Sequence, residues 1–310
     1  MKVVMSSSET NLSLFEAAAR TGTTIAIRRE PVSRFLSVQG LNLHHLDWGS
    51  DDKPPMLCIH GSAQNAHMWD FTALAFCDQY HIVAIDQRGH GDSEWASNHD
   101  YGREAYLGDI KGVVEALGFE SPILMGLSMG GNSAIAYTTA SPSVVRALIV
   151  VDVGPEPSLR GEGAVNSFVT QSDVLDSFEQ FVERVIEYSP FRPEWQIRSS
   201  LHHSLRQLPD GRWTWKYDSF LRDPARRSRQ ATARPDPAAR WALWESIRCP
   251  TLLVRGERSD MLDADVAARM IERNSNSQLV EVSNAGHRVP GDNPVGFEHA
   301  VREFLAGLKD

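Results

Sequence analysis

The chain has 310 residues, of which 42% are hydrophobic, and its formal net charge is −9. This length suffices for one large α/β core, or for a core domain that carries a sizeable insertion. The moderately acidic balance gives no reason to expect a general affinity for nucleic acid or for a membrane surface. No stretch approaches the roughly 20 apolar residues that cross a bilayer, and residues 1–30 lack the pattern of a secretory signal peptide. We therefore expect a soluble enzyme that binds neither nucleic acid nor membrane.

Cysteine usage indicates the compartment. The three cysteines, Cys58, Cys77 and Cys249, are an odd number and lie in apolar surroundings. Buried free thiols fit this pattern better than a disulfide framework does. The expectation is a cytoplasmic protein.

Residues 1–30 are expected to form an N-terminal arm. Within it, Asn11–Arg20 has apolar residues at Leu12, Phe15 and Ala19, which is the spacing of a short amphipathic helix. Such an arm is either a loosely docked extension or a part of a homodimer contact or of substrate access.

From Phe35 onwards the pattern becomes that of strands. Two alternating segments separated by a glycine predict a hairpin, RFLSVQG and LNLHHLDWG. Six short apolar runs follow, each bounded by turn residues: MLCIH, HIVAID, PILMG, RALIVVD, TLLVRG and QLVEVS. Such runs are typical of a parallel sheet that is buried on both faces. Helical patterns separate several of them, so we expect an α/β fold with a doubly wound, mostly parallel sheet.

The alternation of strands and helices stops between Gly154 and about Ser246, where helical patterns occur without buried-strand runs. We therefore predict a core made of residues 31–154 and 247–310, with a helical cap inserted over residues 155–246. Five of the eight tryptophans fall in the cap: Trp195, Trp213, Trp215, Trp241 and Trp244. They would pack inside the cap or form a pocket wall.

The strongest chemical signal is the segment GLSMGG, which lies between the apolar run PILM and a helical pattern. It is a G-x-S-x-G motif in the order strand, sharp turn, helix. Gly126 and Gly130 lack the Cβ atoms that would collide in so tight a turn, so Ser128 can adopt a strained conformation with its hydroxyl exposed. The start of the following helix favours an anion beside that hydroxyl. Ser128 is the predicted nucleophile.

A serine hydroxyl needs a positioned base, and the base needs a carboxylate that holds its tautomer. His287 lies in the loop that follows the last apolar run, where α/β sheets place functional side chains, and is the predicted base. Asp260 follows the penultimate run, between Ser128 and His287 in chain order, and is the predicted carboxylate. Three further carboxylates compete for this role, two nearby and a displaced one that ends the run ALIVV: Asp263, Asp265 and Asp152.

The oxyanion that forms when a serine attacks a carbonyl needs preorganised donors, which are usually backbone N–H groups. One N–H is expected from Met129, directly after the nucleophile. The other is expected from Ser62, in the loop that follows the first long apolar run.

Together these motifs resemble those of the α/β-hydrolase superfamily, in the branch of small cap-bearing esterases, lactonases and meta-cleavage C–C hydrolases. The resemblance runs from about Phe35 to Leu308 and rests on five segments: HGSAQNAHMW, DQRGHGDSEW, GLSMGG, RGERSD and GHRVPGDNP. It implies the α/β-hydrolase fold and a triad in the chain order Ser, Asp, His. It also implies that polar residues of the second segment brace loops and do no chemistry: Asp86, Arg88, His90 and Ser93.

The resemblance implies hydrolysis of a small or medium carboxylic ester or lactone through an acyl-enzyme. A C–C bond of a meta-cleavage product or an amide is the alternative substrate, although Ala63, Gln64 and Asn65 depart from the HGxGPG loop of many meta-cleavage hydrolases. Peroxyacid formation by the same acyl-enzyme is a further option. Ser128 argues against dehalogenation and epoxide opening, for which some relatives use an aspartate at this position. A non-catalytic ligand receptor is the alternative of a different class.

Three other patterns point to no further function. Six arginines within Arg222–Arg240 have no aromatic residue between them, which favours a solvated cap surface over a nucleic-acid site; an acidic substrate or a partner chain is the alternative. The pairs His44-His45 and His202-His203 are adjacent and therefore point to different faces, so no metal is predicted. No G-x-G-x-x-G follows a strand, so no cofactor is predicted.

Overall fold

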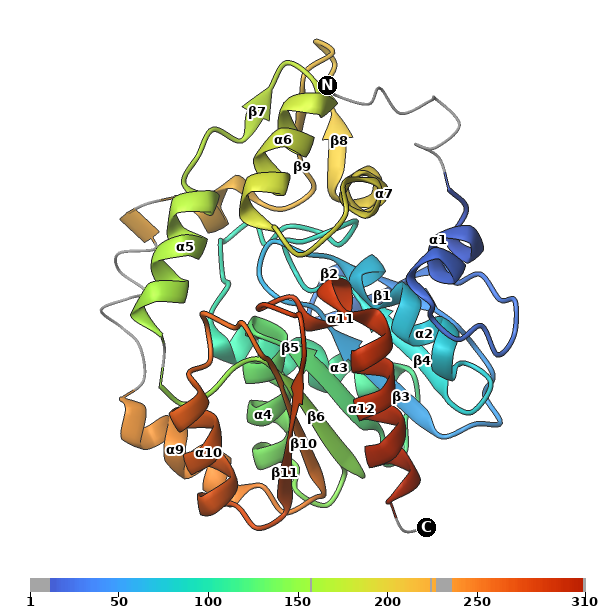
Figure 1. Ribbon diagram of the computed structural model, residues 1–310, viewed down its shortest axis with the longest axis vertical. Coiled ribbons are helices and arrows are strands. Elements are labelled where there is room, and N and C mark those ends of the chain that lie inside the picture. The colour runs from blue at the N-terminus through green and yellow to red at the C-terminus, as the bar shows by residue number, and fades with distance from the viewer. Residues whose placement is uncertain (1–11, 157, 224, 227–235, 309–310) are drawn as a thin grey trace.

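The computed structural model describes residues 12–156, 158–223, 225–226 and 236–308 (Figure 1). Its centre is an eight-stranded sheet with the strand order β1-β2-β4-β3-β5-β6-β10-β11. The strands are β1 (Val32–Val38), β2 (Leu41–Asp47), β3 (Pro55–Ile59), β4 (His81–Ile85), β5 (Ile123–Leu127), β6 (Ala147–Val151), β10 (Thr251–Gly256) and β11 (Ser277–Val282). The pairs β1–β2 and β2–β4 are antiparallel and all other neighbours are parallel, which confirms the predicted hairpin and the predicted fold class.

Helices cover both faces of this sheet because alternate residues of each strand point to opposite sides. In β5, for example, Met125 packs into one hydrophobic cluster and Leu124 into the other. The first face carries α1 (Leu14–Thr21), η1 (Ala66–Trp69), α2 (Asp70–Phe76), α11 (Val289–Asp292) and α12 (Pro294–Ala306). The second face carries α3 (Arg103–Ala116), α4 (Met129–Ala140), α9 (Pro237–Ser246) and α10 (Ala264–Arg273).

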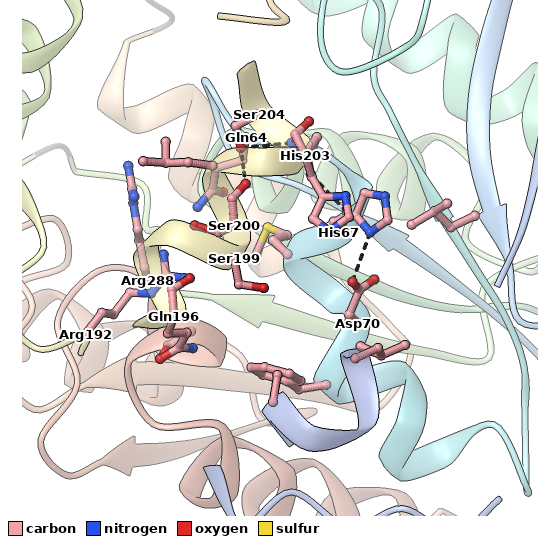
Figure 2. Close-up of a pocket in the computed structure, with 18 of the residues that line it drawn as sticks. Gln64, His67, Asp70, Arg192, Gln196, Ser199, Ser200, His203, Ser204 and Arg288 are labelled. Carbon is pink, nitrogen blue, oxygen red and sulfur yellow. Dashed lines mark hydrogen bonds and ion pairs between the residues drawn. The ribbon is translucent and has the colours of Figure 1, made fainter. Parts of the chain in front are cut away.

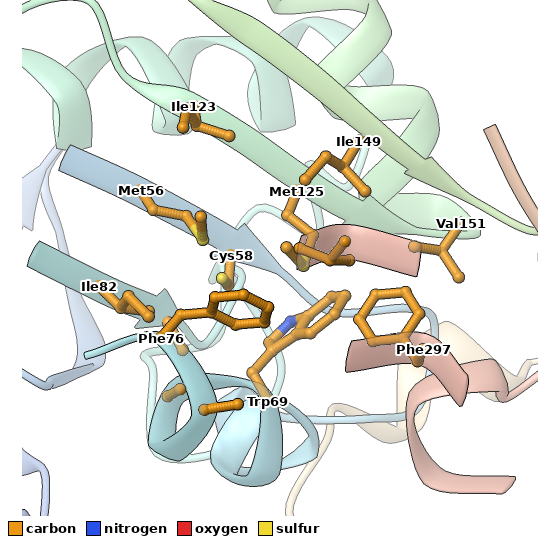
Figure 3. Close-up of a cluster of buried hydrophobic side chains, with 14 of the residues drawn as sticks. Met56, Cys58, Trp69, Phe76, Ile82, Ile123, Met125, Ile149, Val151 and Phe297 are labelled. Atoms are coloured by element: carbon orange, nitrogen blue, oxygen red, sulfur yellow. The ribbon is translucent and has the colours of Figure 1, made fainter. Parts of the chain in front are cut away.

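Large aromatic side chains fill the space under the first face. Trp69, Phe76 and Phe297 are almost completely buried, and they pack against strand residues such as Met125 and Val151 (Figure 3). These contacts join η1, α2 and α12 to the sheet, so segments far apart in the chain share one core.

The N-terminal arm is docked on the core. Its helix α1 begins one residue after Ser13, whose side chain forms a capping box with Glu16. Ala18 of this helix is completely buried in the first hydrophobic cluster, and the backbone N–H of Thr24 donates to Glu298 at 3.0 Å. The predicted helix is therefore present, although Asn11, its expected first residue, lies outside the described residues.

The inserted region forms a separate layer at one end of the sheet (Figure 1). It contains α5 (Leu159–Val169), β7 (Val174–Leu175), α6 (Phe178–Tyr188), α7 (Glu194–Ser204), β8 (Leu205–Gln207), β9 (Trp213–Trp215) and η2 (Ser219–Arg222). Its own hydrophobic cluster includes Phe181 and Trp215. Besides the predicted helices, this region contains strands that the sequence did not indicate, since β7, β9 and β8 pair into a small antiparallel sheet.

The end of the inserted region also differs from the prediction. Helix α9, which was expected in the cap, packs against α4, and its Trp241 and Trp244 belong to the second core cluster. The Nε1–H of Trp244 donates to the carbonyl of Met270 at 2.7 Å, which fastens α9 to α10.

The cysteines lie in the interior of the protein. Cys58, Cys77 and Cys249 are all buried free thiols, as predicted. Within the described ranges, no helix is both long enough and apolar enough to cross a membrane.

Candidate active site

Ser128 occupies a strained turn between β5 and α4. Its φ of 53° and ψ of −114° lie outside the regions that non-glycine residues normally adopt, and its N–H donates to the carbonyl of Val151 at 3.0 Å. A Cβ on Gly126 would lie 2.4 Å from the carbonyl oxygen of Gly130, and one on Gly130 would lie 2.3 Å from that of Ile59. Only glycines fit at both positions, so the G-x-S-x-G spacing is what allows the turn.

The neighbouring strand brings a carboxylate to the same edge of the sheet. Leu127 of β5 is paired with Val151 of β6, so the residues that follow them, Ser128 and Asp152, both lie at the carboxyl ends of adjacent parallel strands. Asp152 is completely buried and has a positive φ of 52°. Polar groups at the carboxyl ends of such strands are positioned for function.

Three donors surround the Asp152 carboxylate. Its Oδ1 accepts the N–H of Gly256 at 3.1 Å, and its Oδ2 accepts the hydroxyl of Ser259 at 2.5 Å. The Nδ1 of His287 lies 2.8 Å from the same Oδ2. Because an ionised carboxylate can only accept, Nδ1 carries the proton and Nε2 is left as the basic nitrogen of the ring.

The structure therefore corrects the predicted carboxylate. Asp260 lies on the turn after β10, but it is Asp152 that holds the imidazole of His287. The residue before Asp260, Ser259, turns inward and donates to Asp152 instead. The two carboxylates that follow Asp260 lie elsewhere: Asp263 precedes α10 at its N-terminus and Asp265 lies 3.5 Å from Arg269.

Within the described residues, no hydrogen bond joins the Ser128 hydroxyl to His287. Hydrogen bonds between a nucleophile and its base are commonly long without substrate and shorten in the reacting complex. The fixed elements are the strained serine, the buried carboxylate and the imidazole that it orients.

The two predicted oxyanion donors lie where their amides are available. Met129 is the first residue of α4, and the first N–H groups of a helix have no partner within the helix. Ser62 lies in a loop that is held by two hydrogen bonds: Gly61 N–H to Gln64 Oε1 at 3.0 Å and Gln64 N–H to the Gly61 carbonyl at 3.3 Å. In the described part of the chain, no backbone acceptor takes the N–H of Ser62.

The segment DQRGHGDS braces the surrounding loops, as the resemblance implied. Asp86 accepts from His44 Nδ1 at 2.7 Å, from the N–H of Ala66 at 2.6 Å and from the N–H of Asp92 at 2.9 Å. Burial raises the pKa of the Asp86 carboxyl, but the bond from His44 and nearby positive charge hold that pKa below its usual range. Arg88 forms a two-pronged ion pair with Asp109, at 2.5 and 2.7 Å.

A cavity of about 570 Å³ lies between the core, the cap and the N-terminal segment (Figure 2). Its lining includes Ala63 and Gln64, which follow Ser62, and Arg288, which follows His287. Ser128 and His287 themselves are not in the lining. The cavity therefore adjoins the candidate site from the side of the oxyanion loop.

One group of side chains in this cavity had no recognisable signal in the sequence. The rings of His67 and His203 stack with their centroids 3.6 Å apart, and His67 Nδ1 lies 2.9 Å from Asp70 Oδ2 (Figure 2). Imidazole and carboxylate groups gathered in this way are of a kind that can hold a metal ion. His67 belongs to the core and His203 to the cap, so only the fold brings them together.

Comparison with known proteins decides the family. A sequence profile described as the alpha/beta hydrolase family matches residues 56–300. The chain belongs to the α/β-hydrolase family. This α/β hydrolase is 27% identical to the esterase Rv0045c of Mycobacterium tuberculosis. The alignment spans 283 residues and covers 89% of this chain and 90% of that relative. It is also 30% identical over 261 residues to a 3-hydroxybutyrate-oligomer hydrolase of Cupriavidus necator. That alignment covers 81% of this chain and 89% of the relative.

Solved structures agree with this assignment. An α/β hydrolase from Novosphingobium aromaticivorans superposes with a TM-score of 0.79 at 26% identity and covers 90% of this chain and 99% of its own. The crystal structure of E-2-(acetamidomethylene)succinate hydrolase superposes with a TM-score of 0.80 at 23% identity, over 89% and 100% of the two chains. The predicted family and fold are confirmed, and the protein is a hydrolase.

Proposed function

We propose that this α/β hydrolase cleaves a small or medium carboxylic ester or lactone through an acyl-enzyme on Ser128. The observation that carries the proposal is the hydrogen bond between the buried Asp152 and His287, at the sheet edge where Ser128 lies in a strained turn. That arrangement supplies an oriented base for a hydroxyl that is otherwise a weak nucleophile.

In the first half of the reaction, the Oγ of Ser128 attacks the ester carbonyl carbon and gives its proton to His287 Nε2. The resulting oxyanion is stabilised by the N–H groups of Ser62 and Met129. The bond to the alcohol oxygen then breaks, and the departing alcohol takes the proton from His287. Asp152 stabilises the imidazolium while it exists.

In the second half, water attacks the acyl-enzyme carbonyl and gives a proton to His287. The bond to the Oγ of Ser128 breaks, the serine recovers its proton from His287, and the carboxylic acid leaves. Both halves use the same oxyanion donors, so no further group is needed for the chemistry.

The relatives support an ester substrate. One is named an esterase, and another is named a 3-hydroxybutyrate-oligomer hydrolase. The competing proposal is that the same triad cleaves an amide or a C–C bond. It is favoured by a 25% identical relative from Mesorhizobium japonicum that is named a 2-(acetamidomethylene)succinate hydrolase. Product analysis separates these proposals, because amide cleavage releases an amine and ester cleavage releases an alcohol.

Turnover of p-nitrophenyl acetate and butyrate tests the proposal. We expect hydrolysis by the unmodified enzyme and a loss of about 10³-fold or more in Ser128→Ala. Ser133→Ala is the matched control, since its hydroxyl lies on the same helix and donates to the Met129 carbonyl at 3.1 Å. Full activity in Ser128→Ala would exclude the mechanism, and the absence of any turnover would favour the non-catalytic receptor.

A further inference from the structure

Two arginines lie together at one end of the cavity beside the candidate site (Figure 2). Arg192 follows Phe191 in the segment between α6 and α7, and Arg288 directly follows His287. Both side chains line the cavity, together with Gln196. Two like charges thus lie together in the cavity wall, one of them on the residue that follows the proposed base.

Within the described residues, no carboxylate oxygen lies at ion-pair distance from either arginine. The guanidinium of Arg288 lies 4.9 Å from the centre of the Tyr188 ring. Their hydrogen bonds are long: Arg192 donates to the Gln196 carbonyl and Arg288 to the Ser189 hydroxyl, both at 3.4 Å. The Nε of Arg192 is buried, and no acceptor reaches it in the described part of the chain.

Asp292 is an acidic residue that interacts electrostatically with both arginines. Its Oδ2 accepts the N–H of Gly286 at 3.0 Å. Burial raises the pKa of the Asp292 carboxyl, which the positive charges of Arg192 and Arg288 oppose. Burial and, to a smaller extent, the charge of Arg288 together lower the pKa of Arg192 to about 10. The guanidinium of Arg192 therefore stays charged at neutral pH, beside a second arginine in the same cavity wall.

A buried cation without a partner is costly, and most proteins pair such groups. A guanidinium presents several N–H donors in one plane, which matches the two oxygens of a carboxylate. The Nε of Arg192, which has no acceptor in the described residues, therefore suits a carboxylate brought by a ligand, with Arg288 beside it as a second donor.

The position of the pair links it to catalysis. Arg288 is adjacent to His287 in the chain, and the ring of Phe191 packs so closely on Gly286 that a Cβ there would lie 2.9 Å from it. The same cavity reaches Ala63 and Gln64, next to the proposed oxyanion donor Ser62. The two arginines and the loop of the proposed oxyanion donor thus line the same cavity.

We propose that Arg192 and Arg288 bind a carboxylate of the substrate, so that the preferred substrates are esters that also carry a free carboxylate. This inference rests on the proposed ester hydrolysis and names its substrate class. It differs from the expectation for the arginines of Arg222–Arg240, of which the described ones, Arg222, Arg226 and Arg240, do not line this cavity.

A matched pair of esters tests the inference. The p-nitrophenyl monoester of glutaric acid carries a carboxylate at the end of its acyl chain, and p-nitrophenyl hexanoate has a chain of similar length without charge. We expect the unmodified enzyme to have a higher kcat/KM for the glutarate ester. In Arg192→Gln and Arg288→Gln, the ratio of the two kcat/KM values should fall about tenfold or more, mainly through KM, because a charge-assisted hydrogen bond is lost.

Two further variants make the test decisive. Arg192→Lys keeps the charge and should retain part of the preference, whereas Arg248→Gln removes an exposed arginine outside the cavity and should leave the ratio as it was. Circular dichroism shows whether each variant is folded. A ratio that stays constant in both glutamine variants would overturn the inference while leaving ester hydrolysis intact.

A binding measurement covers the case in which neither ester is cleaved. Calorimetric titration of glutarate into Ser128→Ala then tests the site without turnover. Binding that is weakened about tenfold by adding Arg288→Gln would support the carboxylate site. Equal affinity in the two proteins, or no binding in either, would overturn it. Failure of the proposed function is thus distinguished from failure of this inference.

Discussion

The Oδ2 of Asp152 lies 2.8 Å from the Nδ1 of His287, although 135 residues separate them in the chain. This bond connects the end of β6 to the loop after β11, on the far side of β10 in the sheet. Ser259, which follows β10, donates to the same Oδ2 at 2.5 Å and so fixes the carboxylate from the strand between them. The orientation of the proposed base therefore depends on three strands at once.

Replacing Asp152 by asparagine should impair catalysis far more than the same change at Asp260. An amide would leave His287 free to adopt the wrong tautomer, so we expect Asp152→Asn to lower kcat for p-nitrophenyl butyrate by about 10³-fold to 10⁴-fold. Asp260→Asn should stay within about twofold of the unmodified enzyme, since Asp260 does not hold the imidazole. Steady-state kinetics of the two variants decides, and the reverse order of effects would restore Asp260 as the orienting carboxylate.

Gly130→Ala should prevent the proposed nucleophile from being positioned. The new Cβ would meet the carbonyl oxygens of Ile59 and His60 at 2.3 and 2.6 Å, and backbone atoms cannot move away easily. We expect loss of activity together with a lower melting temperature. Gly163→Ala is the matched control, because a Cβ there meets none of the described atoms within 4 Å and alanine is the better helix former. Normal activity in Gly130→Ala would show that the turn tolerates a side chain.

The core under the first face of the sheet should be sensitive to the loss of one aromatic ring. Phe297 is 1% exposed and packs with Trp69, their ring centroids 6.2 Å apart. Phe297→Ala should lower the free energy of unfolding by about 3–5 kcal/mol, the usual result of emptying a buried aromatic site. Phe35→Ala, at a side chain that is 57% exposed, should change it by less than about 1 kcal/mol. Urea unfolding of both variants measures the difference, and equal effects would contradict the described packing.

A buried histidine should make the fold sensitive to acid. Neither ring nitrogen of His45 has a hydrogen-bond partner in the described residues, and burial lowers its pKa from 6.5 to about 4. As the pH falls from about 6.5 to 4, the unfolded chain takes up a proton that the folded chain does not, so stability falls by up to about 1.4 kcal/mol per pH unit. His45→Leu should flatten this slope, whereas the change His299→Leu, at an exposed position, should not. Urea unfolding at several pH values gives both slopes, and an unchanged slope in His45→Leu would refute the assignment.

The sequence predicts the sheet and the positions of Ser128 and His287 because those signals are local. The G-x-S-x-G motif needs only its own glycines, and the loop after the last apolar run is recognisable without knowing the strand order. The choice between Asp152 and Asp260 is not local, since both follow a buried strand and both fit the chain order. It depends on which side chain turns inward, and Ser259 occupies the inward position beside Asp260.

Parts of the cap could likewise not be predicted from local sequence signals. Its strands β7, β8 and β9 have two or three residues each, which is too short for an alternating pattern to be recognised. The rings of His67 and His203 meet only because the cap closes over η1, and no spacing in the chain indicates that contact.

The most direct test of the proposed mechanism is to trap its covalent intermediate. The enzyme is mixed with p-nitrophenyl acetate, quenched in acid within the burst of product release, and digested for mass spectrometry. We expect one acetyl group on the peptide that contains Ser128, and no adduct in Ser128→Ala. Turnover with no acyl group on Ser128, or with the acyl group on another residue, would contradict it.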